Sequence, residues 1–128
     1  MKIKSTSVPA TVAVVSIDGQ PINGSSHMVM VYSTNAVNTG MEVSNDMSTL
    51  FNQGSLPVLV ECGSLKINLK NSSELELWAL ALDGTRTEKI PIKIKDGIKQ
   101  IFLDMSILKN GPTPFFELVH KDKVKLIL

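Results

Sequence analysis

The sequence contains few of the side chains that most catalytic and metal sites use. Its 128 residues include one cysteine, Cys62, and two histidines, His27 and His120. A single cysteine excludes a disulfide within the chain, and so few thiols and imidazoles argue against a structural zinc site. The residue types therefore predict neither a metal nor a cofactor.

Aromatic residues and net charge are also scarce. Aromatic residues make up 5% of the chain, and 13 basic against 12 acidic residues leave a formal net charge of +1. Proteins that bind nucleic acid are usually strongly basic, so this balance predicts no nucleic-acid partner. The second half is the more basic one. Its lysines alternate along the expected strands, which favours a solvated face over a phosphate-binding track.

Long hydrophobic runs are missing. The longest apolar stretches, 8–15 and 75–82, span about eight residues, whereas a membrane-spanning helix needs about 20. Residues 1–7 lack the uninterrupted apolar segment of a signal peptide. We therefore expect no membrane segment in this chain. Its localisation stays open, with a secreted or periplasmic parent protein among the alternatives.

Short apolar runs between turn signals dominate what is present. In 64–69, Leu65, Ile67 and Leu69 alternate with polar residues, the period of two that turns one face of a strand inward. Turn signals such as Asp-Gly and Asn-Gly recur at short intervals. This spacing predicts an all-β fold, an antiparallel β-sandwich of about nine strands with a Greek-key, immunoglobulin-like or jelly-roll-like order.

The clearest local predictions concern 74–103. Residues 74–82 read as the strongest strand, and Asp83-Gly84 joins it to a second strand over 86–95. Pro91 cannot donate to a ladder, so that second strand is expected at an edge. Asp96-Gly97 then predicts a hairpin into 98–103. Other expected strands are 8–17, 27–32, 58–61, 64–69, 115–119 and 123–128.

Helical structure is expected in at most two short turns. Asn45-Asp46 predicts a cap for a turn that ends before Gly54, and Asp104 predicts a cap for 105–108. We expect residues 1–128 to form one domain, with 1–7 and 120–128 less ordered or peripheral.

No spacing assembles a catalytic site. The candidate carboxylates are not paired by any motif, and no Gly-x-Ser-x-Gly elbow accompanies the two histidines. Glu61 beside Cys62 opposes formation of a thiolate, so this cysteine is predicted to be a small core or turn residue. The sequence predicts no enzyme and leaves ligand-binding residues unknown. The carboxylates considered are Asp18, Glu42, Asp46, Glu61, Asp83 and Glu117.

The aromatic residues give little support for a sugar platform. Trp78 and Phe115-Phe116 lie in apolar segments and are predicted to belong to the core. Tyr32, at the end of an expected strand, is the best remaining candidate for an exposed platform.

Five ordered blocks carry a family resemblance. They are 17–22 (IDGQPI), 34–41 (TNAVNTGM), 54–61 (GSLPVLVE), 77–86 (LWALALDGTR) and 111–118 (GPTPFFEL). The chain resembles, over about 8–119, the C-terminal all-β domains that follow a TIM-barrel catalytic domain in bacterial glycoside-hydrolase-like proteins.

This resemblance implies a non-catalytic β-sandwich that packs beside a catalytic barrel, and we therefore expect the chain to be one domain of a larger protein. No catalytic residue of the family maps onto it, because those residues lie on the barrel. Two hypotheses follow. An accessory domain predicts an exposed apolar patch where the barrel docks, whereas a stand-alone carbohydrate-binding module predicts a row of exposed aromatic residues.

Overall fold

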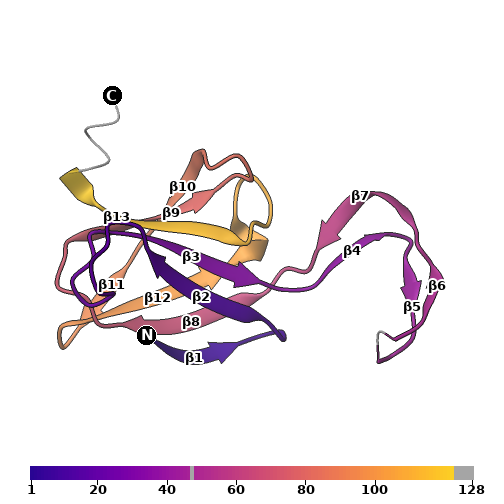
Figure 1. Ribbon diagram of the computed structural model, residues 1–128, viewed down its shortest axis with the longest axis horizontal. Helices are drawn as coiled ribbons and strands as arrows, with labels where there is room; N and C mark the ends of the chain where they lie inside the picture. Colours follow the sequence, from indigo (N-terminus) through magenta and orange to yellow (C-terminus); the bar gives the residue numbers. More distant parts are fainter. Residues whose placement is uncertain (47, 123–128) are drawn as a thin grey trace.

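Alternating apolar residues organise the chain into two antiparallel sheets that pack face to face (Figure 1). This is a computed structural model that describes residues 1–46 and 48–122. The first sheet, called sheet A, has the strand order β1-β8-β12-β11, and the second, sheet B, has the order β10-β9-β13-β3-β2. The predicted all-β sandwich is therefore confirmed.

Sheet A brings together strands that lie far apart in the sequence. Its strands are β1 (Lys2–Thr6), β8 (Ser64–Leu69), β12 (Ile98–Asp104) and β11 (Lys93–Lys95). The edge strand β1 pairs with β8, although no strand was expected over residues 2–6. This pairing places the N-terminal lysines beside those of the second half of the chain.

Sheet B has β13 near its centre, between β9 and β3. Its strands are β10 (Arg86–Ile90), β9 (Leu75–Leu80), β13 (Phe115–His120), β3 (His27–Ser33) and β2 (Thr11–Ser16). The strand predicted over 123–128 lies outside the described residues.

The core lies between the inner faces of the two sheets. The predicted alternation of β8 is confirmed, since Leu65, Ile67 and Leu69 are all buried. Burial of such side chains stabilises the fold by about 1.5–3 kcal/mol each. The other fully buried members are Met28, Met30, Tyr32, Leu77, Ala79, Ile101, Leu103, Met105, Phe116 and Leu118.

The predicted turns at the two Asp-Gly pairs are confirmed. Gly84 has a φ of 89° in the turn between β9 and β10, and Asp96 and Gly97 have φ of 53° and 76° between β11 and β12. Asp104 also caps the short 3-10 helix η1 (Met105–Ile107), as predicted, by accepting a hydrogen bond from the Ser106 amide.

The single strand predicted over 86–95 is wrong, because the chain changes sheets at Pro91. Residues before it form β10 at the edge of sheet B, and residues after it form β11 at the edge of sheet A. Proline has no N–H to donate to a ladder, so a strand ends there readily. The edge placement predicted from Pro91 therefore applies to two strands.

A long β-arm, residues 34–62, projects from the sandwich between β3 and β8 (Figure 1). It consists of two short ladders, one formed by β4 (Ala36–Thr39) with β7 (Ser55–Val60) and one by β5 (Glu42–Val43) with β6 (Leu50–Asn52). The helical turn predicted after Asn45 is wrong. The Ser44 hydroxyl donates a hydrogen bond to Asp46, and the chain returns as strand β6, which pairs with β5.

Candidate functional site

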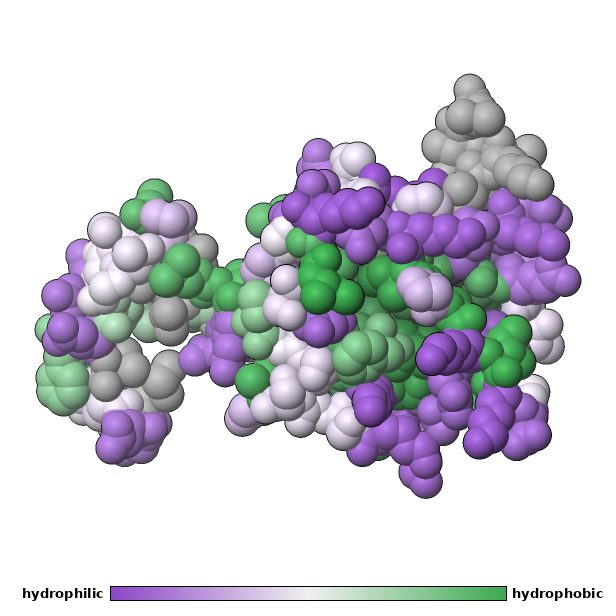
Figure 2. Space-filling view, turned by 180° about the vertical axis from the view of Figure 1, so that it is seen from behind, coloured by the Kyte–Doolittle hydropathy of each residue, from purple (hydrophilic) through white to green (hydrophobic). Residues whose placement is uncertain are grey.

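Most of the apolar side chains that the structure describes on the arm are exposed. Leu50, Phe51, Leu56 and Leu59 are exposed, Leu56 to 81% and Phe51 to 68%. None of the arm side chains that the structure describes is buried. Figure 2 shows hydrophobic residues on the arm and beside its junction with the sandwich. A two-stranded ribbon of this kind is marginally stable in water unless another surface covers it.

The arm also carries charge of one sign. It contains Glu42, Asp46 and Glu61 and no lysine, arginine or histidine. Leu59 and Val60 follow one another in a regular part of β7, so they lie on opposite faces of the ladder. Apolar residues on both faces are typical of a strand that is covered on both sides. The arm thus combines exposed apolar side chains with charge of one sign.

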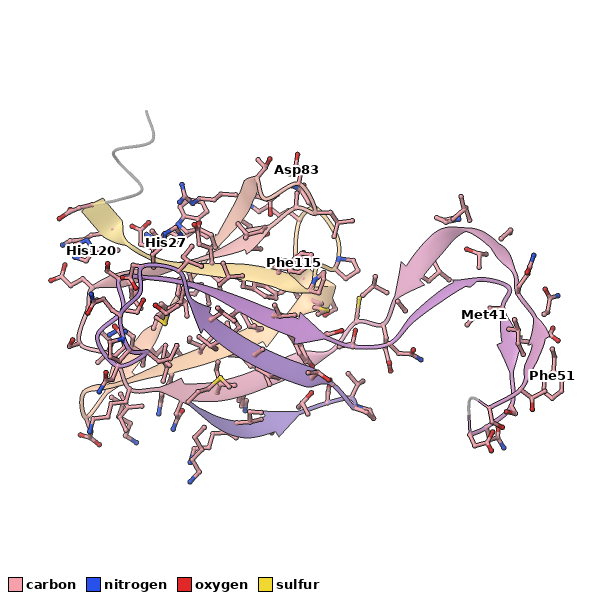
Figure 3. All side chains as sticks on the ribbon, viewed as in Figure 1. His27, Met41, Phe51, Asp83, Phe115 and His120 are labelled. Atoms are coloured by element: carbon pink, nitrogen blue, oxygen red, sulfur yellow. The ribbon has the colours of Figure 1, made fainter. Side chains whose placement is uncertain are left out.

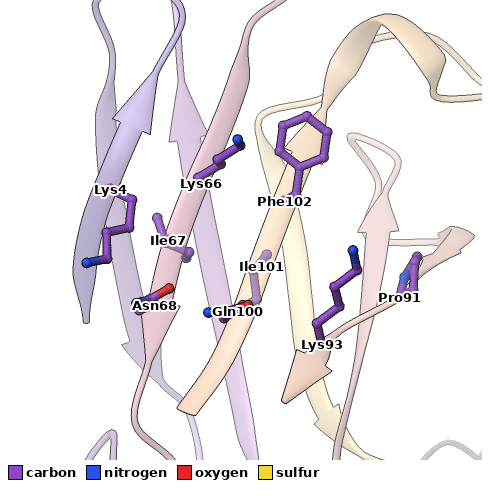
Figure 4. A pocket seen from close by; sticks show the side chains of 9 residues that line it. All are labelled: Lys4, Lys66, Ile67, Asn68, Pro91, Lys93, Gln100, Ile101 and Phe102. Carbon is purple, nitrogen blue, oxygen red and sulfur yellow. The ribbon is translucent and has the colours of Figure 1, made fainter. Parts of the chain in front are cut away.

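A groove of about 570 Å³ crosses the outer face of sheet A (Figure 4). The register places Lys2, Asn68, Gln100 and Lys93 in one row across the four strands, with all four side chains on the same face. In the neighbouring row Lys66 pairs with Phe102, and its Nζ lies 5.7 Å from the centre of the ring.

The lysines of this groove have no carboxylate partner in the described chain, because the ion pairs found in residues 1–46 and 48–122 involve other residues. Asp104 lies on the same face at the end of β12, but its carboxylate accepts hydrogen bonds from Ser106. The groove is therefore strongly positive. The lysines on or beside this face are Lys2, Lys4, Lys66, Lys93 and Lys95.

The outer face of sheet B contains a buried ion cluster around Glu117. Its carboxylate, on a residue only 8% exposed, accepts hydrogen bonds from the Arg86 guanidinium and lies 2.6 Å from Nε2 of His27. Burial alone would raise the pKa of Glu117, but the bonds from Arg86 and His27 outweigh it and hold the pKa below its usual value. The cluster ties β3, β13 and β10 together across the sheet.

Two candidate residues, His27 and Glu117, thus come together although 90 positions separate them in the sequence. Figure 3 shows His27 at the start of β3, on the opposite side of the sandwich from Met41 and Phe51 of the arm. The carboxylate is engaged by both Arg86 and His27, so its hydrogen bonds link three strands of the sheet. No sequence pattern links the two residues, because only strand pairing brings them together.

The other candidate carboxylates stay apart and have local roles. Asp18 accepts hydrogen bonds from the Ser26 amide and from the hydroxyls of Ser16 and Ser25, which lower its pKa far below the usual range. Hydrogen bonds from Ser44 and Ser48 lower the pKa of Asp46 to about 2.

Asp83 closes the turn before β10 by accepting a hydrogen bond from the Thr85 amide, which lowers its pKa. Glu42 and Glu61 are exposed on the arm. Retaining and inverting glycosidases need two carboxyl groups about 5–9.5 Å apart in one cleft. Asp18, Asp46 and Asp83 belong to separate turns, whereas Glu42 and Glu61 lie on the arm.

The cysteine lies at the end of the arm, and the second histidine lies on sheet B. Cys62 is exposed in the connection between β7 and β8, so a core position for it is excluded. His120 is half-buried at the end of β13, where Nδ1 accepts a hydrogen bond from the Asp122 amide.

The aromatic predictions are only partly correct. Tyr32 is fully buried, and its hydroxyl contacts Thr6 Oγ1 at 2.8 Å and donates to the Ser64 carbonyl, so it is no sugar platform. Phe116 lies in the core as predicted. Trp78 and Phe115 instead are half-buried on the outer face of sheet B, where Trp78 Nε1 donates to Glu76. Phe51 and Phe102 are the exposed aromatic residues of the described chain.

A polar network closes one end of the sandwich. Lys99 is buried, and its Nζ donates to the Asn71 carbonyl at 2.6 Å, while burial lowers its pKa. The Asn71 amide donates to the carbonyls of Ile22 and Ser25. Every buried side-chain nitrogen and oxygen found in the described residues has a partner.

Metal and membrane features are not found among residues 1–46 and 48–122. No group of three or more histidine, cysteine or acidic side chains in them is placed to bind a metal ion. Within the same residues, no helix has the length and hydrophobicity to cross a bilayer.

Fold and surface together define a β-sandwich module with a projecting apolar arm and a basic groove. Comparison of the chain with protein-family models, with curated proteins and with solved structures found no match.

Proposed function

We propose that the chain is a non-catalytic accessory domain of a carbohydrate-active, glycoside-hydrolase-like protein, and that its arm docks against the catalytic barrel of that protein. The exposed apolar arm carries this proposal. Two of the five blocks of family resemblance, 34–41 and 54–61, fall on the arm and contain β4 and β7. The family resemblance and the exposed apolar surface therefore both favour the arm as the docking segment.

The energetics favour docking to a tethered partner. Burial of Leu50, Phe51, Leu56 and Leu59 would contribute about 1.5–3 kcal/mol for each side chain. Association of two separate molecules costs an estimated 4–15 kcal/mol in lost translational and rotational freedom. A covalent link to the partner reduces that cost, because docking becomes an intramolecular step. A small apolar arm is thus sufficient for a domain that shares a chain with its partner.

The arrangement of the carboxylates supports a non-catalytic role. Asp18 and Asp83 stabilise turns, and Glu117 is held by Arg86 and His27. In this account the hydrolytic acid and base belong to the barrel, and the sandwich contributes structural support.

The test uses the barrel sequence encoded next to this chain in its genome. We expect a reading frame for a barrel there, and we expect the arm amides of the joined protein to exchange hydrogen more slowly than those of the chain alone. Leu56→Ser should restore fast exchange. Leu82→Ser is the matched control, because Leu82 is also 81% exposed but lies on the sandwich. Equal arm exchange in both proteins, or a neighbourhood without a barrel, would contradict the proposal.

The alternative is a stand-alone carbohydrate-binding module. It predicts a row of exposed aromatic residues, but the two exposed aromatics of the described chain, Phe51 and Phe102, lie on the arm and on sheet A respectively. This arrangement weighs against a platform for neutral crystalline polysaccharides. The basic groove favours a different kind of glycan.

A further inference from the structure

We propose that the groove on the outer face of sheet A binds an acidic polysaccharide, whose carboxylate or sulfate groups pair with the groove lysines. This inference rests on the proposed function for the choice of a glycan, and on the groove itself for the choice of an anionic one. The site is built from Lys4, Lys66, Asn68, Lys93, Gln100 and Phe102 (Figure 4).

The lysines without carboxylate partners are the first argument. Neighbouring strands are about 4.8 Å apart, so the row from Lys2 to Lys93 spans about 14 Å with a cation at each end. Like charges gathered on one face repel one another and raise the local concentration of anions. A linear polyanion lying across the strands would satisfy several ammonium groups at once. A single small anion would satisfy only one or two.

The residues between the lysines are the second argument. Asn68 and Gln100 are direct cross-strand neighbours, and their amides offer both donors and acceptors to sugar hydroxyls. Phe102 is 49% exposed and presents an apolar surface on which a sugar ring can stack. The groove therefore combines cations for acidic groups with neutral groups suited to the sugar between them.

A nucleic acid fits this groove less well. Arginine provides the bidentate contacts to phosphates and bases that nucleic-acid sites favour, but the one arginine of the chain, Arg86, is held by Glu117 on sheet B. Single strands also stack on several aromatic residues, whereas Phe102 is the exposed aromatic residue of this face in the described chain. Lysine, a mobile point charge, suits acidic groups of varied orientation.

The experiment measures binding of the full chain by calorimetry to four probes at two salt concentrations. The probes are polygalacturonate oligosaccharides, heparin oligosaccharides, neutral maltooligosaccharides and single-stranded DNA. The test variant is Lys66→Gln/Lys93→Gln. The matched control is Lys89→Gln/Lys109→Gln, which removes the same charge at exposed positions outside the groove.

We expect polygalacturonate or heparin to bind, neutral oligosaccharides not to bind, and DNA to bind more weakly than the acidic glycan. The test variant should weaken glycan binding about tenfold and reduce its salt dependence, because two surface ion pairs are lost. The control should bind within about twofold of the unmodified chain. Phe102→Ala should weaken glycan binding without changing the salt dependence, because ring stacking is insensitive to salt.

Several results would overturn the inference. They are the absence of binding to either acidic glycan, equal loss in test and control variants, or DNA binding as tight as glycan binding with no effect of Phe102→Ala. Sedimentation of the free chain adds one more. If the chain self-associates and Lys66→Gln/Lys93→Gln abolishes the association, the acidic arm of a second copy occupies the groove.

The outcomes for groove and arm are separable. Glycan binding is measured on the chain alone and depends on groove lysines, whereas docking is measured by hydrogen exchange and depends on Leu56. If the acidic glycans do not bind but the arm amides are protected in the joined protein, only the proposal for the groove is contradicted. Glycan binding without arm protection would remove the docking role and leave a binding module.

Discussion

The sandwich and the arm show opposite ways of using hydrophobic residues. In the sandwich, side chains such as Ile67 and Phe116 are enclosed between the two sheets. In the arm, leucines and a phenylalanine of similar size stay in contact with water. Burial supplies most of the stability of a domain, so the sandwich is expected to hold its own fold. The arm, by contrast, has no buried side chain among those described, so it is expected to be the less stable region.

The largest expected effect comes from removing one phenylalanine ring from each region and comparing the losses of stability. Phe116→Ala empties a fully buried site between the sheets and should lower the free energy of unfolding by about 3–5 kcal/mol. Phe51→Ala removes the same ring from the exposed arm and should change it by less than about 0.5 kcal/mol. Urea denaturation followed by Trp78 fluorescence checks both. Equal losses would mean that the arm is part of the cooperative core.

The next effect concerns the ion cluster of sheet B. Glu117→Gln removes the anion that holds Arg86 and His27, and should cost about 3 kcal/mol because the Arg86 guanidinium stays behind without its anionic partner. Urea denaturation at neutral pH measures this loss. A variant as stable as the unmodified chain would contradict the structural role of Glu117.

The pH dependence of the same variant is its control. The pKa of Glu117 is lowered in the folded state, so its contribution is complete above the ordinary value of 4.5 and is lost as the pH falls through the lowered folded value. Glu117→Gln should therefore flatten the fall in stability below that ordinary value. An unchanged acid profile would show that the loss at neutral pH has another cause.

Alanine substitution of two glycines, one packed against the sandwich and one in the arm, tests whether the two regions unfold separately. A Cβ on Gly63 would lie 2.5 Å from the hydroxyl of the buried Tyr32 and 2.7 Å from Val8 Cγ2, so Gly63→Ala should cost about 1–3 kcal/mol. A Cβ on Gly54 would clash with the Thr39 carbonyl, and Gly54 has a positive φ of 70°, which disfavours alanine. Gly54, however, lies in the arm. Gly54→Ala should disturb the β4–β7 ladder in NMR spectra and leave the midpoint of global unfolding unchanged. A shift of that midpoint would contradict the separation of the two regions.

The smallest expected effect compares two aspartates that both have lowered pKa values. Serine side chains and backbone amides hold Asp18 in the sandwich and Asp46 in the arm. Each ionised carboxylate stabilises the folded state at neutral pH, and this stabilisation is lost as the pH falls through the lowered pKa. Asp18→Asn should shift the acid unfolding of the whole domain, whereas Asp46→Asn should change only local arm signals. Identical acid unfolding of the two variants would count against an independent arm.

Local chemistry explains which parts of the fold were predictable from the sequence. The turns at Asp83-Gly84 and Asp96-Gly97, the cap at Asp104 and the buried face of β8 depend on neighbouring residues, and the structure confirms them. The exchange of sheets at Pro91 was not predictable, because proline marks the end of a ladder but not the destination of the chain.

The candidate sites depend on long-range pairing and were missed for that reason. The groove joins lysines from β1, β8 and β11, and the ion cluster joins β3, β10 and β13. Lys66, Lys93 and Lys95 lie on exposed strand faces, as the alternation predicted, but Lys99 is buried, and nothing in the sequence placed the N-terminal lysines on the same face. Tyr32 was misjudged because its hydroxyl finds partners inside the fold, where a polar tip can be buried at little cost.

Amide hydrogen exchange on the chain alone tests most directly whether the arm lacks stability of its own. We expect the amides of β13, β3 and β8 to exchange only through global unfolding, and those of β4 to β7 to exchange through low-energy local opening. A large gap in protection between the two regions would support an arm that awaits a covering surface. Arm amides protected as strongly as those of β13 would contradict this account.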